Sequence, residues 1–248
     1  MRAMILAAGL GTRLRPLTND RPKALVEIAG RTLLEITLER LRTFGIHEVI
    51  INVHHFADKV VDYLHAHRDF GMKIVISSEN VLLDTGGGLK KAAWFFLERP
   101  GSSDAPFIVH NVDVLSTIDL RHMIDNHRKH DALATLAVQK RKTSRYLLFD
   151  SLRRLCGRRN GEDGKPELVH DAPTYDALAF SGIHVISPQL LSRLTEDGAF
   201  SIITSYLRLA AEGESIQGFQ ADDYYWRDLG KPENVAQAEQ DIRNRLVG

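Results

Sequence analysis

Cysteine is almost absent from this sequence, and long apolar runs and net charge are absent altogether. Its one cysteine, Cys156, excludes an internal disulfide and is typical of a protein of a reducing, cytoplasmic setting. No apolar run approaches the ~18–20 residues of a transmembrane helix, so we expect no membrane span. Lys and Arg together number 32, as do Asp and Glu, which argues against a nucleic-acid partner and directs attention to local clusters.

Strand and helix patterns alternate along the first half of the chain. Apolar and β-branched runs predict strands at 2–7, 48–53, 72–77, 107–111 and 132–138. Apolar residues at helical spacing predict helices at 32–44, 56–64, 89–97 and 119–130, with Pro100 closing the third. This order predicts an α/β fold: a Rossmann-like, mainly parallel sheet with helices on both faces and ligands at the carboxyl ends of its strands.

The pattern changes after about residue 139. Residues 145–169 are typical of short strands joined by polar turns, and 177–187 predict a further strand. A helix is predicted at 201–211, and 224–235 run from a strand into a second helix. Because no linker or internal repeat is present, we expect one domain over 1–248 with an antiparallel elaboration in its second half.

The first predicted strand ends in a loop that combines glycine with positive charge, namely Gly9, Gly11, Arg13, Arg15, Arg21 and Lys23. Glycines let backbone N–H groups converge on an anion, and Arg and Lys add charge and donors. The combination suits a polyphosphate. Neither standard phosphate motif is present, because a dinucleotide fingerprint needs a third glycine where Leu14 stands and no P-loop pattern occurs. From the residues alone, a glycine turn with solvated arginines is equally compatible.

The segment "GLGTRLRPLT" (9–18), followed by "RPKAL" (21–25), resembles the signature of the sugar-1-phosphate nucleotidyltransferases. Further matching segments follow in the same order: "DTGGGL" (84–89), "HNVDVL" (110–115), "AFSGIHVIS" (179–187) and "YWRDLGKPE" (225–233). The resemblance implies transfer of a nucleotidyl group (an EC 2.7.7 reaction) in which NTP and a sugar 1-phosphate give an NDP-sugar and pyrophosphate. It is greatest to the N-acetylmuramate-1-phosphate uridylyltransferases, which implies UTP. GTP-dependent heptose- or mannose-1-phosphate guanylyltransferases are the alternative.

The resemblance also implies roles for individual residues. Arg13 would contact the leaving pyrophosphate and Lys23 the phosphates of the reacting pair, while Asp113 and Asp228 would hold Mg²⁺. Further nucleotide contacts would come from Leu6, Ala7, Ala8, Gly9, Gly11, Thr12, Glu79, Gly86, Gly87 and Asn111. Sugar contacts would come from Asp84, Phe180, Ser181 and Gly182. Residues 1–138 would form the nucleotide-binding half and residues 139–248 the sugar-phosphate-binding half.

Two features of these motifs are open to another interpretation. From the residues alone, Asp113 is explained by a turn and Asp228 by a helix cap, although Mg²⁺ prefers one or two carboxylates together with water and phosphate. The glycines 86–88 would mark a tight turn or a helix N-terminus. The resemblance instead places them against the nucleoside, where side chains would collide. The family commonly has glycine where Val112 stands, and proline where Ala24 stands.

Histidines and a basic run have simpler interpretations. His122, His127 and His130 lie on one predicted helix, and their spacing does not build a four-ligand zinc site. We interpret them as part of a solvated helix face. The basic run 153–159 is interpreted as the surface of a hairpin, with an oligomer contact as the alternative, so we expect a monomer or a homodimer.

Three other functions compete with the transferase. A catalytically silent sugar-nucleotide sensor of the same fold is opposed by the joint presence of Arg13, Lys23, Asp113 and Asp228. A nicotinamide dehydrogenase is opposed by Leu14, which replaces the third glycine of its fingerprint. A phosphocholine-type cytidylyltransferase would be a different enzyme of the same reaction class.

Overall fold

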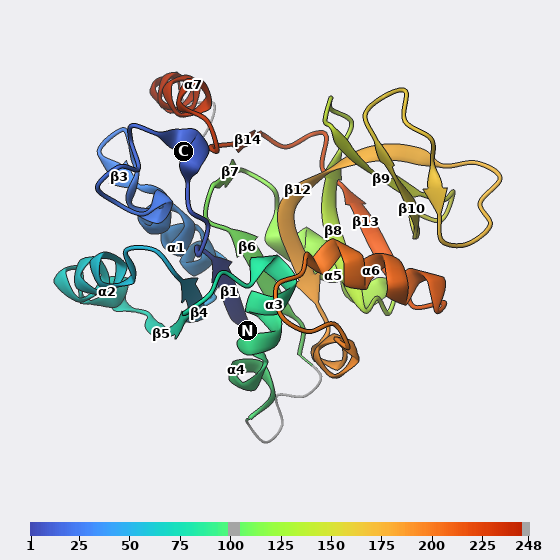
Figure 1. The fold of residues 1–248 in the computed structure, drawn as a ribbon, viewed down its shortest axis with the longest axis horizontal. Helices are drawn as coiled ribbons and strands as arrows, with labels where there is room; N and C mark the ends of the chain where they lie inside the picture. Colours follow the sequence, from blue (N-terminus) through green and yellow to red (C-terminus); the bar gives the residue numbers. More distant parts are fainter. Residues whose placement is uncertain (99–104, 245–248) are drawn as a thin grey trace.

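A ten-stranded mixed sheet forms the centre of the molecule. The computed structural model describes residues 1–98 and 105–244, and the sheet has the strand order β11-β10-β9-β12-β6-β1-β4-β5, with β8 and β13 joining beside β12. Four neighbouring strands are parallel: β6 (Phe107–Asn111), β1 (Arg2–Leu6), β4 (Glu48–Val53) and β5 (Lys73–Ser78). These strands lie at the left and centre of Figure 1. The strands predicted at 2–7, 48–53, 72–77 and 107–111 are confirmed.

The second half of the chain adds mostly antiparallel strands to the same sheet. β12 (Asp176–Ile186) pairs antiparallel with β6 and thereby joins the two halves. The remaining strands are β8 (Ala134–Gln139), β9 (Arg145–Phe149), β10 (Leu155–Asn160), β11 (Glu167–Leu168) and β13 (Ile216–Gln220). β13 is parallel to β8, whereas β9, β10 and β11 are antiparallel to their neighbours. The predicted α/β fold with an antiparallel elaboration is confirmed.

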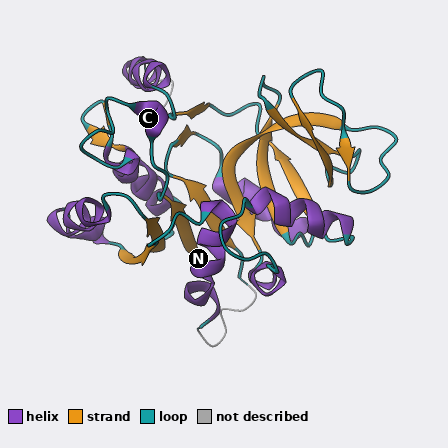
Figure 2. Ribbon diagram, viewed as in Figure 1, coloured by secondary structure: helices purple, strands orange, loops and turns teal. Residues whose placement is uncertain are grey.

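Helices cover both faces of the sheet (Figure 2). One face carries α1 (Leu33–Thr43), α2 (Ala57–Ala66), α5 (Leu120–Lys129) and α7 (Pro232–Arg243), and the other carries α3 (Asp84–Lys91), α4 (Ala93–Leu97) and α6 (Ile202–Ala211). Strand residues alternate between the two cores, since Ile5 packs in the first and Met4 in the second. Within 1–98 and 105–244, every helix is too short or too polar to cross a membrane.

Short elements complete the chain. The 3₁₀ helices are η1 (Thr12–Leu14), η2 (Lys23–Leu25), η3 (Arg68–Gly71) and η4 (Pro188–Arg193), and the short strands are β2 (Glu27–Ile28), β3 (Arg31–Thr32), β7 (Val114–Ser116) and β14 (Trp226–Asp228). β2, β3 and β7 were not predicted, because two or three residues show no hydrophobic period. β7 and β14 pair with each other and position the site.

Two sequence predictions about helices are wrong in detail. The helix predicted at 89–97 is two helices, and the first begins earlier, at Asp84; Pro100, predicted to close it, lies outside the described residues. The solvated face predicted for the histidines of α5 fails at His127, which is 3% exposed. Its ring nitrogens bond Thr135 Oγ1 and Ser187 Oγ, each at 2.9 Å. Here hydrogen bonding to the sheet makes burial of a histidine favourable.

Candidate active site

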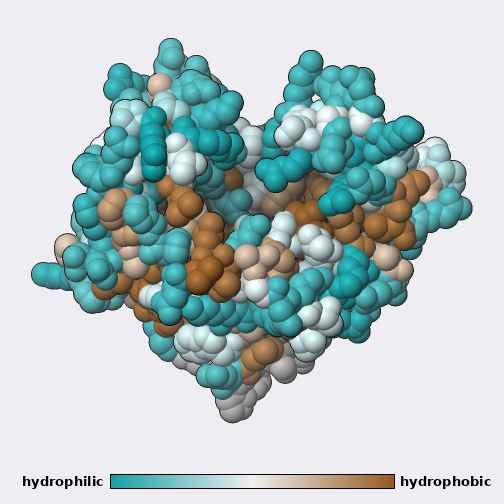
Figure 3. Space-filling view, viewed as in Figure 1, coloured by the Kyte–Doolittle hydropathy of each residue, from teal (hydrophilic) through white to brown (hydrophobic). Residues whose placement is uncertain are grey.

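The carboxyl ends of the parallel strands open onto a cleft between the two halves, visible as the hollow at the top of Figure 3. Two adjoining cavities occupy this cleft. The strand-end cavity measures about 420 Å³ and lies beside the ends of β1 and β6; the hairpin cavity measures about 510 Å³ and lies against β9 and β10. Both volumes are in the range of small-molecule sites. The cavities share Asp84, Thr85, Asn111 and Asp113, so their occupants would meet at these residues.

The strand-end cavity gathers half of the residues predicted to bind nucleotide. Its walls include Leu6, Ala7, Ala8, Gly9, Lys23 and Asn111. The backbone after β1 is fixed by Asn52, whose Oδ1 accepts the N–H of Ala7 at 2.8 Å. Asn52 was missed from the sequence, although a polar residue near the end of an apolar strand was the available signal.

Glu79 has a different role from the one predicted. The residue is 4% exposed and does not line either cavity. It accepts Asn52 Nδ2 at 2.7 Å and the backbone N–H of Leu83 at 3.0 Å. Because both oxygens bond the protein, Glu79 holds Asn52 and the 79–83 segment in place rather than facing a ligand.

The glycines of α3 also have a different explanation from the one predicted. Neither Gly86 nor Gly87 lines a cavity, and the N–H of Gly86 donates to Phe200 O at 2.9 Å. A Cβ at Gly86 would overlap the Phe200 ring, and one at Gly87 would overlap the carbonyl oxygen of Gly198. These glycines therefore let α3 pack against the 198–200 segment. Packing within the protein, rather than a clash of side chains with a bound nucleoside, therefore explains why glycine stands at these two positions.

The glycine loop is held in shape by its own backbone. Gly11 has a φ of +64°, and its carbonyl accepts Leu14 N at 2.9 Å and Thr18 Oγ1 at 2.8 Å. Gly11, Thr12 and Arg13 lie beside the strand-end cavity without lining it. A Cβ at Gly230 would lie 2.8 Å from Arg13 Nη2 and 2.6 Å from Asp228 Oδ1, so both side chains flank Gly230.

Lys23 and Asp113 form an ion pair at the boundary of the two cavities. Lys23 begins η2, and its side chain is 11% exposed against 20% for Asp113. A pair this far removed from solvent is screened little by salt. The structure thus places the lysine of the glycine loop against the aspartate that follows β6.

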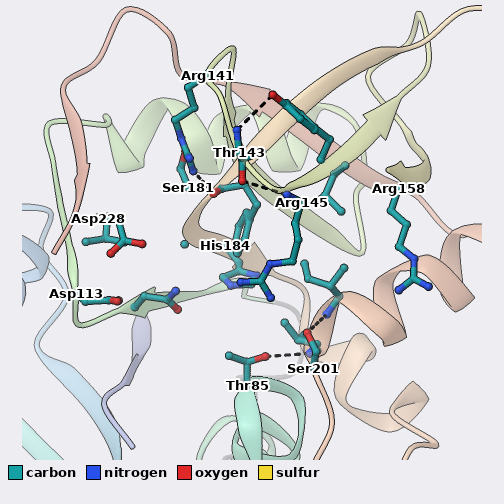
Figure 4. A pocket seen from close by; sticks show the side chains of 18 of the residues that line it. Thr85, Asp113, Arg141, Thr143, Arg145, Arg158, Ser181, His184, Ser201 and Asp228 are labelled. Carbon is teal, nitrogen blue, oxygen red and sulfur yellow. Dashed lines mark hydrogen bonds between the residues drawn. The ribbon is translucent and has the colours of Figure 1, made fainter. Parts of the chain in front are cut away.

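Asp113 and Asp228 are brought together by a pair of short strands. In the β7–β14 ladder Asp228 faces Val114, and Leu229 N donates to Asp113 O at 2.8 Å. Asp228 Oδ1 accepts the N–H of Gly230 at 2.5 Å. Among the described residues, Asp113 Oδ1 and Asp228 Oδ2 have no protein donor, and both carboxylates point into the cavity in Figure 4.

This donor set fits a hard divalent cation. Two carboxylates with free oxygens at an open cavity supply the protein share of a Mg²⁺ shell, whose remaining ligands are water and phosphate. In the described part of the chain, His, Cys, Asp and Glu form no cluster of three or more that would make an all-protein metal cage. Val112, which stands where the family commonly has glycine, is 3% exposed and packs in the core, and the N–H of Val112 donates to Leu6 O at 3.1 Å.

The hairpin cavity contains the residues predicted to contact sugar: Asp84, Phe180, Ser181 and Gly182. Gly182 has a φ of +75°, and a Cβ there would lie 2.9 Å from Asn111 Nδ2, so this position requires glycine. Asn111 Oδ1 is buried and has no hydrogen-bond partner among the described residues. An unpaired buried oxygen between two cavities favours a ligand that donates a hydrogen bond there.

Three arginines of the hairpin cavity were missed: Arg141, Arg145 and Arg158. Arg141 lies 3.7 Å from the centre of the Trp226 ring and donates to Phe180 O at 2.6 Å, and burial lowers its pKa. His184 also lines the cavity, and burial lowers its pKa to about 3, so it is neutral near pH 7.

The chain matches the family model described as Nucleotidyl transferase over residues 2–245. It belongs to the nucleotidyl transferase family. It is 36% identical to the N-acetylmuramate alpha-1-phosphate uridylyltransferase of Caulobacter vibrioides in an alignment 245 positions long that covers 96% of this chain and 95% of that protein. The predicted membership of the sugar-1-phosphate nucleotidyltransferases is thereby confirmed.

Other members are longer or more distant. The chain is 29% identical to the UTP–glucose-1-phosphate uridylyltransferase of a Synechocystis species, and the match covers all of this chain but 64% of that protein. The crystal structure of HddC from Yersinia pseudotuberculosis, complexed with GMP-PN, superposes with a TM-score of 0.75 at 24% identity, covering 97% of this chain and 99% of that one. At this identity the superposition supports the fold of the chain, not its substrate.

Proposed function

We propose that this protein joins a nucleoside triphosphate to a sugar 1-phosphate and releases pyrophosphate. The observation that carries the proposal is the Lys23–Asp113 ion pair at the boundary of the two cavities, with Asp228 held alongside by strand pairing. The triphosphate would occupy the strand-end cavity and the sugar phosphate the hairpin cavity. Their reacting phosphates would then meet at Asp113. The assignment of nucleotide to residues 1–138 and sugar phosphate to 139–248 belongs to the same proposal.

The chemistry requires positioning and charge stabilisation more than proton transfer. A sugar-phosphate oxygen attacks the α-phosphorus, a P–O bond forms, and the bond to pyrophosphate breaks. The attacking phosphate is largely ionised near pH 7, because the second pKa of a phosphomonoester is about 6. No general base is needed, which is consistent with a cavity histidine, His184, whose pKa is about 3. Lys23 would stabilise charge on the reacting phosphates, and Arg13 charge on the pyrophosphate.

Asp113 and Asp228 would hold Mg²⁺. When bound, the ion neutralises charge on the α-phosphate and fixes its orientation. Asn111 would contribute its unpaired Oδ1 to a hydroxyl of the nucleotide or the sugar. The backbone of Leu6 to Gly9, fixed through Asn52, would face the nucleoside.

UTP is the proposed donor, with GTP the alternative. The support is similarity along almost the whole length of a uridylyltransferase, whereas the glycines of α3 no longer support it, because they pack against the protein. By the same similarity the proposed acceptor is an amino-sugar 1-phosphate, with a heptose 1-phosphate as the alternative. Backbone groups that pair with the N–H and carbonyl of uracil would be left unpaired by adenine, so ATP is expected to be a poor donor.

Pyrophosphate release from a matrix of the four NTPs against sugar 1-phosphates tests the proposal. We expect release that needs both substrates and Mg²⁺, with the highest kcat/KM for UTP. Binding of an NDP-sugar without turnover of any pair would support a sensor instead. A clear preference for ATP or CTP would contradict the proposed donor.

A further inference from the structure

The wall of the hairpin cavity farthest along the sheet is one face of the β9–β10 hairpin. In its register Arg145 stands opposite Asn160, and Leu147 stands opposite Arg158. All four residues line the cavity. Side chains alternate along a strand, so Arg145 and Arg158 lie on the same face as diagonal neighbours across the hairpin. Their guanidinium groups can therefore contact one and the same ligand.

The two arginines differ in how their charge is balanced. Arg158 Nε donates to Glu167 Oε2 at 2.7 Å on the neighbouring strand β11. The guanidinium of Arg145 has no hydrogen bond or ion pair with any residue in the described ranges, and Figure 4 shows it extending into the cavity toward His184. Arg141 differs from both, because its stacking on Trp226 and its bond to Phe180 give it a structural role. Arg145 therefore presents five unused donors to the cavity.

Acidic and basic side chains both line the hairpin cavity, and Arg141 lies close enough to Asp228 to interact with its charge. The acidic residues of the cavity are Asp84, Asp113 and Asp228, and the first two also line the strand-end cavity. Arg145 and Arg158 stand on the hairpin wall, and the N-terminus of α6 lies beside Thr85. The first N–H groups of α6 are bonded by Thr85 Oγ1 and Ser201 Oγ, so the helix adds only its partial positive charge.

We infer that the acceptor sugar carries a second anionic group, a carboxylate or a phosphate, and that Arg145, assisted by Arg158, selects for it. The inference rests on the proposed function, which places the 1-phosphate at Asp113 and turns the rest of the sugar toward the hairpin. A neutral sugar offers only hydroxyls to this wall. An anionic group accepts paired, charge-assisted bonds from a guanidinium fork, which makes Arg145 a specificity-determining residue.

Matched acceptors test the inference. N-acetylmuramate 1-phosphate and N-acetylglucosamine 1-phosphate differ by one carboxylate-bearing ether, and glucose 1,6-bisphosphate and glucose 1-phosphate differ by one phosphate. We expect the wild-type protein to prefer the doubly anionic member of at least one pair by about 10-fold or more in kcat/KM. The preferred pair identifies the anionic group as carboxylate or phosphate.

Variants separate recognition from folding. Arg145→Gln should lose about 10-fold or more in kcat/KM with the preferred anionic acceptor, mainly through KM, and less than about 3-fold with its neutral partner. Arg145→Lys should recover part of the loss, since it keeps the charge without the fork. Arg158→Gln should act in the same direction. Arg128→Gln is the control, because Arg128 is exposed on α5 and lines neither cavity.

The outcomes distinguish the inference from the function on which it rests. Equal use of both members of each pair, or an equal loss with both in Arg145→Gln, would overturn the role of Arg145 and leave the transferase intact. Absence of pyrophosphate release from every acceptor and every NTP would overturn the proposed function itself. A melting temperature of Arg145→Gln within a few degrees of wild type would show that a selective loss is not misfolding.

Discussion

The backbone N–H of Leu229 donates to the carbonyl oxygen of Asp113 at 2.8 Å and continues the β7–β14 ladder. The two aspartates of the site are therefore brought together by main-chain bonds between segments far apart in the sequence. Their carboxylates are not needed for this pairing. Either side chain can be changed while the strands that carry it stay paired, which separates catalytic from structural effects.

Asp113→Asn and Asp228→Asn should each lower kcat/KM by about 100-fold or more, because charge stabilisation of the reacting phosphates is lost. Each should also raise the Mg²⁺ concentration needed for half-maximal rate, since fewer charged ligands remain. Pyrophosphate release against Mg²⁺ concentration measures both effects. Asp163→Asn, at an exposed position of the β10–β11 turn, is the control and should leave both unchanged. Near-normal turnover at limiting Mg²⁺ would refute the metal assignment.

Lys23→Met should remove a cation from the reacting phosphates while keeping most of the buried stem. We expect a loss of about 100-fold or more in kcat. Because Lys23 pairs with Asp113 in a largely buried position, we also expect a stability cost of about 1–3 kcal/mol, more than for a surface lysine. Steady-state kinetics and urea unfolding separate the two. Lys129→Met, at an exposed lysine in the last turn of α5, should change neither; a stability loss of Lys23→Met with normal kinetics would make Lys23 purely structural.

The sequence predicted those parts of the fold that depend on local pattern. The helices predicted at 32–44 and 119–130 from apolar spacing are present as α1 and α5; in the structure Asp119 caps α5 and Gly45, with a φ of +76°, follows α1. The resemblance also predicted that Asp113 and Asp228 share one site, and in the structure the pairing of β7 with β14, outside the main sheet, brings them together.

What the sequence could not predict depends on contacts between distant segments. The role of Gly86 is set by Phe200, and that of Glu79 by Asn52 and Leu83. Arg145 was missed because its place in a cavity depends on the register of a hairpin, which its own residues do not reveal. The resemblance therefore named Lys23, Asp113 and Asp228, which the structure places around one cleft, and it missed the arginines on the hairpin wall of that cleft.

Gly86→Ala should lower the stability of the protein, whereas Gly9→Ala should change substrate binding and leave stability unaltered. A Cβ at Gly86 would overlap Phe200, so this variant should lose about 1–3 kcal/mol of stability, although alanine is usually the better helix former. A Cβ at Gly9 meets nothing within 4 Å, so Gly9→Ala should unfold normally but raise the KM for the NTP. Thermal unfolding and steady-state kinetics test both. An unchanged melting temperature for Gly86→Ala would mean that the packing argument is wrong.

Acidification should destabilise the protein partly through His127. Burial lowers the pKa of His127 from 6.5 to about 4, with a smaller effect of the Arg128 charge. The unfolded chain therefore binds a proton more readily than the folded one, so the contribution of His127 is complete above about pH 6.5 and is lost as the pH falls toward 4. Between pH 7 and 5 this loss amounts to about 2 kcal/mol.

Urea unfolding at pH 7, 6 and 5 measures the contribution of His127. His127→Gln keeps polar contacts to Thr135 and Ser187 but cannot take up a proton, so its stability should fall less steeply with pH than that of wild type. His184, whose pKa burial lowers to about 3, would account for part of the slope that remains. His130→Gln, at an exposed position of the same helix end, should leave the slope unchanged. Parallel pH dependences for wild type and His127→Gln would show that His127 is not the titrating group.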